Sequence, residues 1–112
     1  MNIQTTKEST AMVVTVVGRL DAVTAPEYEQ KFIALISEGE SRFIVDFEKL
    51  DYISSAGLRV LLATAKRVKG KSGAIVLANI GGTVKEVFDI SGFGSIFPMY
   101  ESVATALTAV EK

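Results

Sequence analysis

The fold is decided by residues 51–62, which read DYISSAGLRVLL. An extended segment ends here at two serines, and large apolar residues then recur with the 3.6-residue period of a helix. These apolar residues are Leu58, Leu61, Leu62, Ala65 and Val68. The stretch therefore predicts a strand that passes directly into an amphipathic helix.

Ser54 and Ser55 lie at the start of this predicted helix. Serine is a common N-cap, because its hydroxyl accepts a hydrogen bond from the free N–H groups of the first turn. Capping is the simplest role for one of them. The alternative role is that of a phosphate acceptor, because free N–H groups and the helix dipole favour an anion at a helix N-terminus. The two residues alone do not decide between these roles.

The composition indicates one domain over residues 1–112, with 48% hydrophobic residues to form its core. The net charge of -1 gives no broad attraction to nucleic acid. The basic residues near the end of the central helix complement the negative end of its dipole. No apolar run is long enough to span a membrane and no signal pattern opens the chain, so we expect a cytoplasmic protein that does not bind membranes.

The first part of the chain predicts a hairpin followed by a helix. Residues 2–8 and 11–17 are rich in β-branched residues, and a polar pair separates them. Residues 18–21 are expected to end the second strand. Thr24 and Glu27 then have the spacing of a capping box, which predicts that the next helix starts at Thr24.

The second part predicts alternating strands and helices. Residues 42–47 and 74–78 are continuous apolar runs, typical of strands buried on both faces. Thr83 has capping-box spacing for a short helix that Gly92 ends. Residues 95–100 predict a last strand, placed at the sheet edge by Pro98.

A final helix is expected at residues 102–111. The alternation predicts an α/β domain with a small mixed sheet, made of the N-terminal hairpin and parallel strands. Its helices are expected to pack mainly on one face of the sheet.

Catalysis is not indicated. The chain has no histidine to serve as the usual general base for a serine, and no cysteine for a thiol nucleophile or a disulfide. Asp46, Asp51 and Asp89 are scattered singly near strand and helix ends, where aspartate commonly makes local hydrogen bonds. We therefore expect no catalytic residue, no metal site and no cofactor.

Four segments in order carry a resemblance to a known family. They are residues 18–25 (GRLDAVTA), 43–47 (FIVDF), 52–58 (YISSAGL) and 87–92 (VFDISG). The chain resembles the bacterial anti-sigma factor antagonists, the stand-alone form of the STAS domain shared by sulfate transporters and these antagonists. The resemblance covers nearly the whole chain.

The resemblance implies a partner switch. In that family the unphosphorylated antagonist binds an anti-sigma factor that is also a serine kinase, and so frees the sigma factor. Phosphorylation of one serine at the helix start ends the binding, and a phosphatase restores it. Alignment on Gly57 and Leu58 implies that Ser55 is the phosphate acceptor in this chain, and that Ser54 replaces the family aspartate that precedes it.

The resemblance also implies the binding surface. Asp21 matches a family aspartate close to the acceptor, whereas Arg19 stands where members often have glutamate. The residues expected to bind the partner are Asp21, Ser54, Ser55, Ala56, Gly57 and Arg59. The alternative within the fold is a stand-alone module of another partner-switching, stressosome or lipid-transport system.

Overall fold

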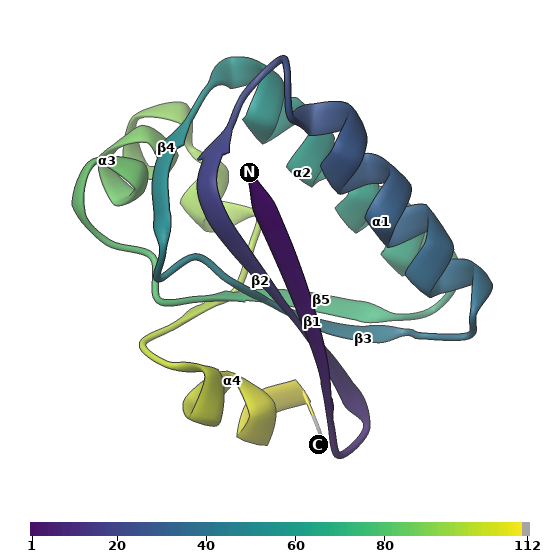
Figure 1. Ribbon diagram of the computed structural model, residues 1–112. Coiled ribbons are helices and arrows are strands. Elements are labelled where there is room, and N and C mark those ends of the chain that lie inside the picture. Colours follow the sequence, from purple (N-terminus) through teal and green to yellow (C-terminus); the bar gives the residue numbers. More distant parts are fainter. Residues whose placement is uncertain (111–112) are drawn as a thin grey trace.

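The computed structural model describes residues 1–110 (Figure 1). The strands are β1 (Asn2–Glu8), β2 (Ala11–Leu20), β3 (Arg42–Asp46), β4 (Leu50–Ile53), β5 (Ala74–Ala78) and β6 (Met99–Tyr100). The helices are α1 (Ala25–Ser37), α2 (Ser55–Gly70), α3 (Gly82–Ser91) and α4 (Val103–Val110), with a 3₁₀ turn at Phe93–Ser95. The last residue of the helix predicted at 102–111 lies outside the described residues.

The sheet is mixed, as the sequence predicts. Its strands follow the order β1-β2-β3-β5-β6, and β4 pairs separately with β2. The β1–β2 hairpin is antiparallel, whereas the pairs β2–β3, β3–β5, β5–β6 and β2–β4 are parallel. Each parallel pair places the carboxyl ends of its strands at the same end of the sheet.

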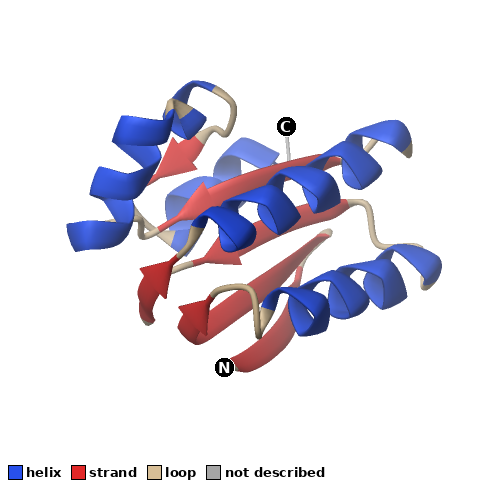
Figure 2. Cartoon of the chain, turned by 90° about the horizontal axis from the view of Figure 1, so that it is seen from above, coloured by secondary structure: helices blue, strands red, loops and turns tan. Residues whose placement is uncertain are grey.

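The helices lie mainly on one face of the sheet, which confirms the prediction (Figure 2). Helices α1, α2 and α3 supply residues to the main hydrophobic core, together with the strands. Helix α4 covers the opposite face through a smaller cluster that includes Ala106, Val110 and Ile44.

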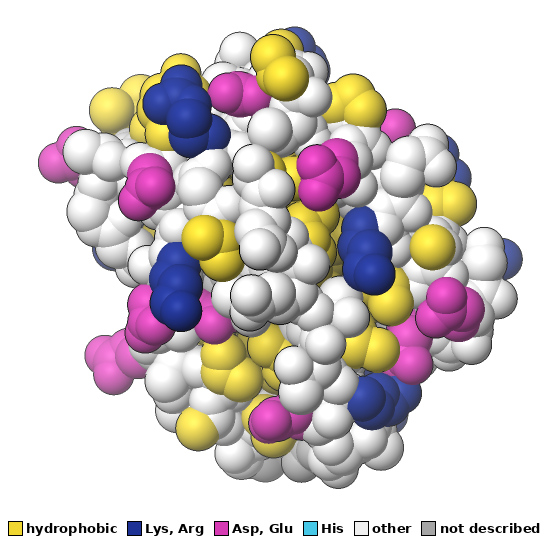
Figure 3. Space-filling view, viewed as in Figure 1, with side chains coloured by type: hydrophobic (Ala, Val, Ile, Leu, Met, Phe, Trp, Pro, Cys, Tyr) yellow, Lys and Arg dark blue, Asp and Glu magenta, His cyan; other side chains and the backbone are white. Residues whose placement is uncertain are grey.

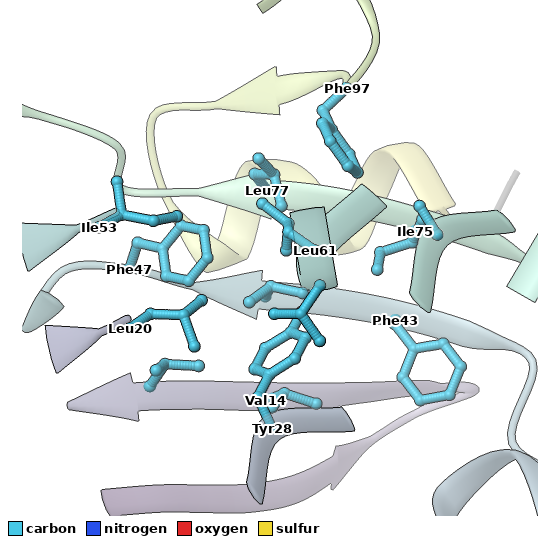
Figure 4. Packing of buried hydrophobic residues seen from close by; sticks show 14 of the residues in the cluster. Val14, Leu20, Tyr28, Phe43, Phe47, Ile53, Leu61, Ile75, Leu77 and Phe97 are labelled. Atoms are coloured by element: carbon cyan, nitrogen blue, oxygen red, sulfur yellow. The ribbon is translucent and has the colours of Figure 1, made fainter. Parts of the chain in front are cut away.

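The main core joins α1 and α2 to the sheet (Figure 4). Tyr28, Phe32 and Phe43 are fully buried, and the Phe32 and Phe43 rings have centroids 5.0 Å apart. Leu61, on the predicted apolar stripe of α2, is also fully buried. The apolar periodicity therefore identified the buried face of α2.

Three predicted boundaries are wrong in detail. Strand β2 does not end before Gly18 but continues to Leu20, because its second half pairs with β4 past an irregularity between Gly18 and Arg19. Helix α3 begins at Gly82 after an N-cap at Gly81, so Thr83 is inside the helix and caps nothing. The strand predicted at 95–100 is reduced to β6, because the chain before it forms the 3₁₀ turn.

Two other predictions for this part of the chain are confirmed. Gly92 ends α3 in the left-handed conformation, with φ of 79°. Strand β6 lies at the edge of the sheet directly after Pro98. A proline is tolerated there because an edge position need not supply an N–H group to a neighbour.

Candidate functional site

The site forms where β2 and β4 end side by side. Leu20 pairs with Ile53, and the N–H of Ser54 donates to the carbonyl oxygen of Leu20 over 3.0 Å. Asp21 therefore follows one strand end and Ser54 follows its neighbour. In Figure 1 the link from β2 to α1 and the start of α2 lie together at the top of the molecule.

Gly57 allows α2 to begin this close to β2. A Cβ atom at this position would lie 2.4 Å from the carbonyl oxygen of Leu20 and 2.9 Å from Cγ1 of Ile53. Both distances are shorter than any van der Waals contact, so a larger residue would force the helix away. Gly57 is buried and therefore serves packing, whereas the partner contact that the resemblance implied for it stays a prediction.

Ser54 is the N-cap of α2. Its backbone is extended, with φ of -98° and ψ of 175°, and its Oγ accepts a hydrogen bond from the N–H of Gly57 over 3.2 Å. Its carbonyl oxygen accepts from the N–H of Leu58 over 2.9 Å. The capping role that the sequence left open between two serines therefore belongs to Ser54.

Ser55 is the first residue of α2, and it is exposed. Its hydroxyl has no hydrogen-bond partner among the residues that the structure describes. The first turn of α2 contains no acidic residue that would repel an anion. Because the cap is supplied by Ser54, the Ser55 hydroxyl is free to carry a phosphate without loss of the cap.

Arg59 adds positive charge on the same side of α2. It lies four residues after Ser55, and residues at this spacing are neighbours on a helix surface. Arg59 is exposed and takes part in none of the ion pairs found within residues 1–110. The helix start and Arg59 together favour a negative group at Ser55.

Asp21 caps the turn that leads into α1. Its Oδ1 accepts hydrogen bonds from the N–H groups of Val23 and Thr24 over 3.0 and 3.2 Å. In return, the Asp21 N–H donates to Oγ1 of Thr24 over 2.9 Å. This reciprocal pair of hydrogen bonds lies three residues earlier than the predicted capping box. The predicted start of α1 is confirmed, since Thr24 is its N-cap residue, but the predicted hydrogen bonds between Thr24 and Glu27 are wrong. Thr24 makes no side-chain cap of its own.

These hydrogen bonds change the acidity of Asp21. The N–H of Thr24 makes the largest contribution, and it lowers the pKa of the Asp21 carboxyl because it stabilises the charged form. Arg19 lies beside the carboxylate, with Nε 3.4 Å from Oδ2. Asp21 is therefore ionised at neutral pH, and Arg19 offsets part of its charge.

Tyr52 and Val23 extend this surface, and the sequence did not single them out. The guanidinium of Arg19 lies 4.3 Å from the centre of the Tyr52 ring, which links β2 to β4. Tyr52 is 42% exposed, and Val23, two residues after Asp21, is 87% exposed. The local sequence carried only a weak signal for Val23, which is an apolar residue in the turn between Asp21 and Thr24. Ala56 and Ser54 are half-buried at the same corner.

Two further findings for residues 1–110 concern metal ligands and membrane-spanning helices. No group of three or more metal-ligating side chains is present there, and none of the helices is long and apolar enough to cross a membrane. Asp46 accepts hydrogen bonds from the Asn79 amide over 2.8 Å and from the Glu48 N–H over 3.1 Å, which is the local role predicted for it. Acidic and basic side chains are interspersed on the face shown in Figure 3.

The fold agrees with comparisons to known proteins. The model of the STAS domain family matches residues 2–106, and the chain belongs to this family. A protein of Bordetella bronchiseptica named as an anti-sigma factor antagonist, BtrV, is 44% identical over 92 residues, which cover 82% of this chain and 79% of BtrV. The anti-sigma-B factor antagonist of Staphylococcus aureus is 26% identical over 101 residues, 90% of this chain and 94% of that protein.

Solved structures show the same fold. An anti-sigma factor antagonist from Mycobacterium paratuberculosis has a TM-score of 0.90 at 28% identity, covering 99% of this chain and 94% of that one. The phosphorylated form of the Bacillus cell fate determinant SpoIIAA has a TM-score of 0.76 at 24% identity, with coverage of 97% and 99%. Within the STAS family, the chain thus resembles the anti-sigma factor antagonists.

The two serines should differ in their effect on stability. Ser54→Ala removes the N-cap and should lower the free energy of unfolding by about 0.5 to 2 kcal/mol. Ser55→Ala removes an exposed hydroxyl without a partner and should change it by less than about 0.5 kcal/mol. Urea denaturation of both variants measures this difference. A larger loss for Ser55→Ala than for Ser54→Ala would contradict the assignment of the cap.

Asp21 should stabilise the protein through its cap and its charge. Asp21→Ala should lower the thermal midpoint, whereas Asp21→Asn, which keeps an oxygen acceptor, should lower it less. Because the folded-state pKa is lowered, the advantage of aspartate over asparagine should be complete above about pH 4 and disappear as the pH falls through the lowered value. Thermal melts between acid and neutral pH test this. An advantage independent of pH would show that the charge has no role.

Proposed function

We propose that this protein is an anti-sigma factor antagonist that is switched at Ser55. In its unphosphorylated form it binds an anti-sigma factor that is also a serine kinase, and the sigma factor is released. Phosphorylation of Ser55 ends the binding, and a phosphoserine phosphatase restores it. The names of the relatives support the role as an antagonist. The observation that carries the switch is the division of tasks between Ser54, which caps α2, and Ser55, whose hydroxyl is exposed.

The phosphate would be held without unfolding the helix. It carries about 1.5 to 2 negative charges at neutral pH. At Ser55 these charges meet the free N–H groups of the first turn of α2 and the neighbouring Arg59. The modified helix start is therefore electrostatically stable.

The same phosphate would change the charge of the surface to which the partner binds. We propose that the binding surface consists of Asp21, Ser54, Ser55, Ala56 and Arg59, with the exposed Val23 and Tyr52 as apolar contacts. Aromatic side chains are enriched at the centre of protein interfaces, and polar and charged groups form the rim around them. A phosphate placed inside such a surface must be desolvated on binding and repels acidic groups of the partner, so it favours dissociation.

Two local differences from the family pattern concern the choice of partner. Ser54 stands where the family has an aspartate before the acceptor, so the kinase would contact a neutral residue there instead of a carboxylate. Arg19 replaces a frequent glutamate, and its guanidinium lies between Asp21 and the Tyr52 ring. We propose that the cognate kinase is adapted to a less acidic surface here. Charge differences of this kind act mainly on specificity and association rate.

The site of phosphorylation can be located directly. Incubation with ATP and the cognate serine-kinase anti-sigma factor should add one phosphate, on Ser55, and mass spectrometry of the peptides should locate it. Ser55→Ala should remain unmodified. Ser54→Ala should still be phosphorylated, although it is less stable. Phosphate on Ser54, or phosphate that persists in Ser55→Ala, would show that the acceptor has been misassigned.

A further inference from the structure

Strand β1 is an edge of the sheet that nothing in the described chain covers. It is the first strand in the sheet order, and among the elements of residues 1–110 its extensive contacts are with β2 alone. Figure 1 shows it in front of the other strands, running down the middle of the view, and Figure 2 shows it at the margin of the sheet. Its outer row of N–H and C=O groups is therefore open to pairing.

This edge lacks the usual protection against pairing with another chain. Native edge strands are normally short, interrupted by proline or a bulge, or charged along their length. Strand β1 has seven residues in unbroken register with β2, contains no proline, and carries charge only at Lys7 and Glu8. The opposite edge, β6, has two residues and follows Pro98. Only β6 is thus protected by its length and by a proline.

The register shows which groups of β1 face outward. The two-residue turn Ser9-Thr10 joins Glu8 to its partner Ala11. In a hairpin of this kind the pair next to the turn is hydrogen-bonded, and hydrogen-bonded and non-hydrogen-bonded pairs then alternate. The residues in non-hydrogen-bonded pairs direct their N–H and C=O groups away from β2. In β1 these residues are Ile3, Thr5 and Lys7.

We propose that a second copy of this chain pairs with this edge, antiparallel, about a two-fold axis at Thr5. This register opposes Thr5 to Thr5 and Ile3 to Lys7, so all the outward-facing residues of both copies form hydrogen-bonded pairs. The remaining pairs oppose Gln4 to Thr6 and Asn2 to Glu8. No two like charges are opposed, and Lys7 is already paired with Glu40 of its own chain.

The polar character of the strand agrees with this self-association. Asn2, Gln4 and Thr6 are exposed, and in Figure 3 the middle of this face is mostly uncharged. A single pair of strands buries less surface than the roughly 1,200 to 2,000 Å² of a stable interface, so the dimer is weak and concentration-dependent. Thr5 lies opposite Val14, six residues before Leu20, so the two-fold axis is away from the end of β2 that adjoins the start of α2. The inference does not depend on the proposed function.

Analytical ultracentrifugation tests the dimer. From about 10 µM to about 1 mM, the mean mass of the wild-type protein should rise from 12.0 kDa toward twice that value. In the double variant Gln4→Lys/Thr6→Lys, the lysine at position 4 of each copy faces the lysine at position 6 of the other copy. This repulsion occurs twice across the axis, so dimerisation should require at least tenfold higher protein concentration. The matched variant Gln4→Lys/Thr6→Glu opposes lysine to glutamate and should dimerise at least as well as wild type.

Both variants change exposed side chains only, and thermal melts would verify that they remain folded. A wild-type mass that stays at 12.0 kDa over the whole range would overturn the proposal. Equal dimerisation of the two double variants would also overturn it, because the copies would then associate through another surface.

Discussion

The carbonyl group of Leu20 is the contact on which the arrangement of the site depends. It accepts the hydrogen bond from the N–H of Ser54, and it lies where a side chain at position 57 would have to be. Only glycine permits both the hydrogen bond and the close approach. The start of α2 is therefore held against the end of β2, and the loop that follows β2 becomes its neighbour. A backbone constraint thus brings Asp21 and Ser55 to the same corner.

Two adjacent serines have different roles in the structure of this corner, because Ser54 caps α2 and Ser55 is exposed. A serine that caps a helix has its hydroxyl oxygen engaged with a backbone N–H group. In this chain Ser54 has that role and Ser55 does not. The helix start can therefore gain a phosphate and keep its cap. The free N–H groups and Arg59 provide a favourable environment for the added charge.

Local patterns in the sequence were sufficient to predict most of the fold. The hairpin, the buried strands and the apolar stripe of α2 can be predicted from the types of neighbouring residues and from the spacing of the apolar ones. Gly92 ended α3 as expected, because the left-handed conformation needed there favours glycine. The chain from 18 to 20 was misread as a break, because its partner strand β4 lies more than thirty residues further along the chain.

The capping residues were harder to predict than the elements. Asp21 and Thr24 have capping-box spacing, and so do Thr24 and Glu27, so spacing alone could not choose between them. The choice between Ser54 and Ser55 had the same difficulty. It is settled by the pairing of β4 with β2, which ties the Ser54 N–H to Leu20 and leaves its side chain to cap α2. The exposed Val23 and Tyr52 depend on tertiary placement and had no strong local signal.

The most direct measurement compares the phosphorylated and unphosphorylated forms of the protein for both stability and partner affinity. If Ser55 is a switch at a helix start that keeps its cap, phosphorylation should leave the free energy of unfolding unchanged or raise it by about 0.3 to 1 kcal/mol. Affinity for the anti-sigma factor should fall at least about tenfold, which corresponds to about 1.4 kcal/mol. A phosphorylated form that binds as tightly as the unphosphorylated form, or that loses binding because it unfolds, would contradict this mechanism.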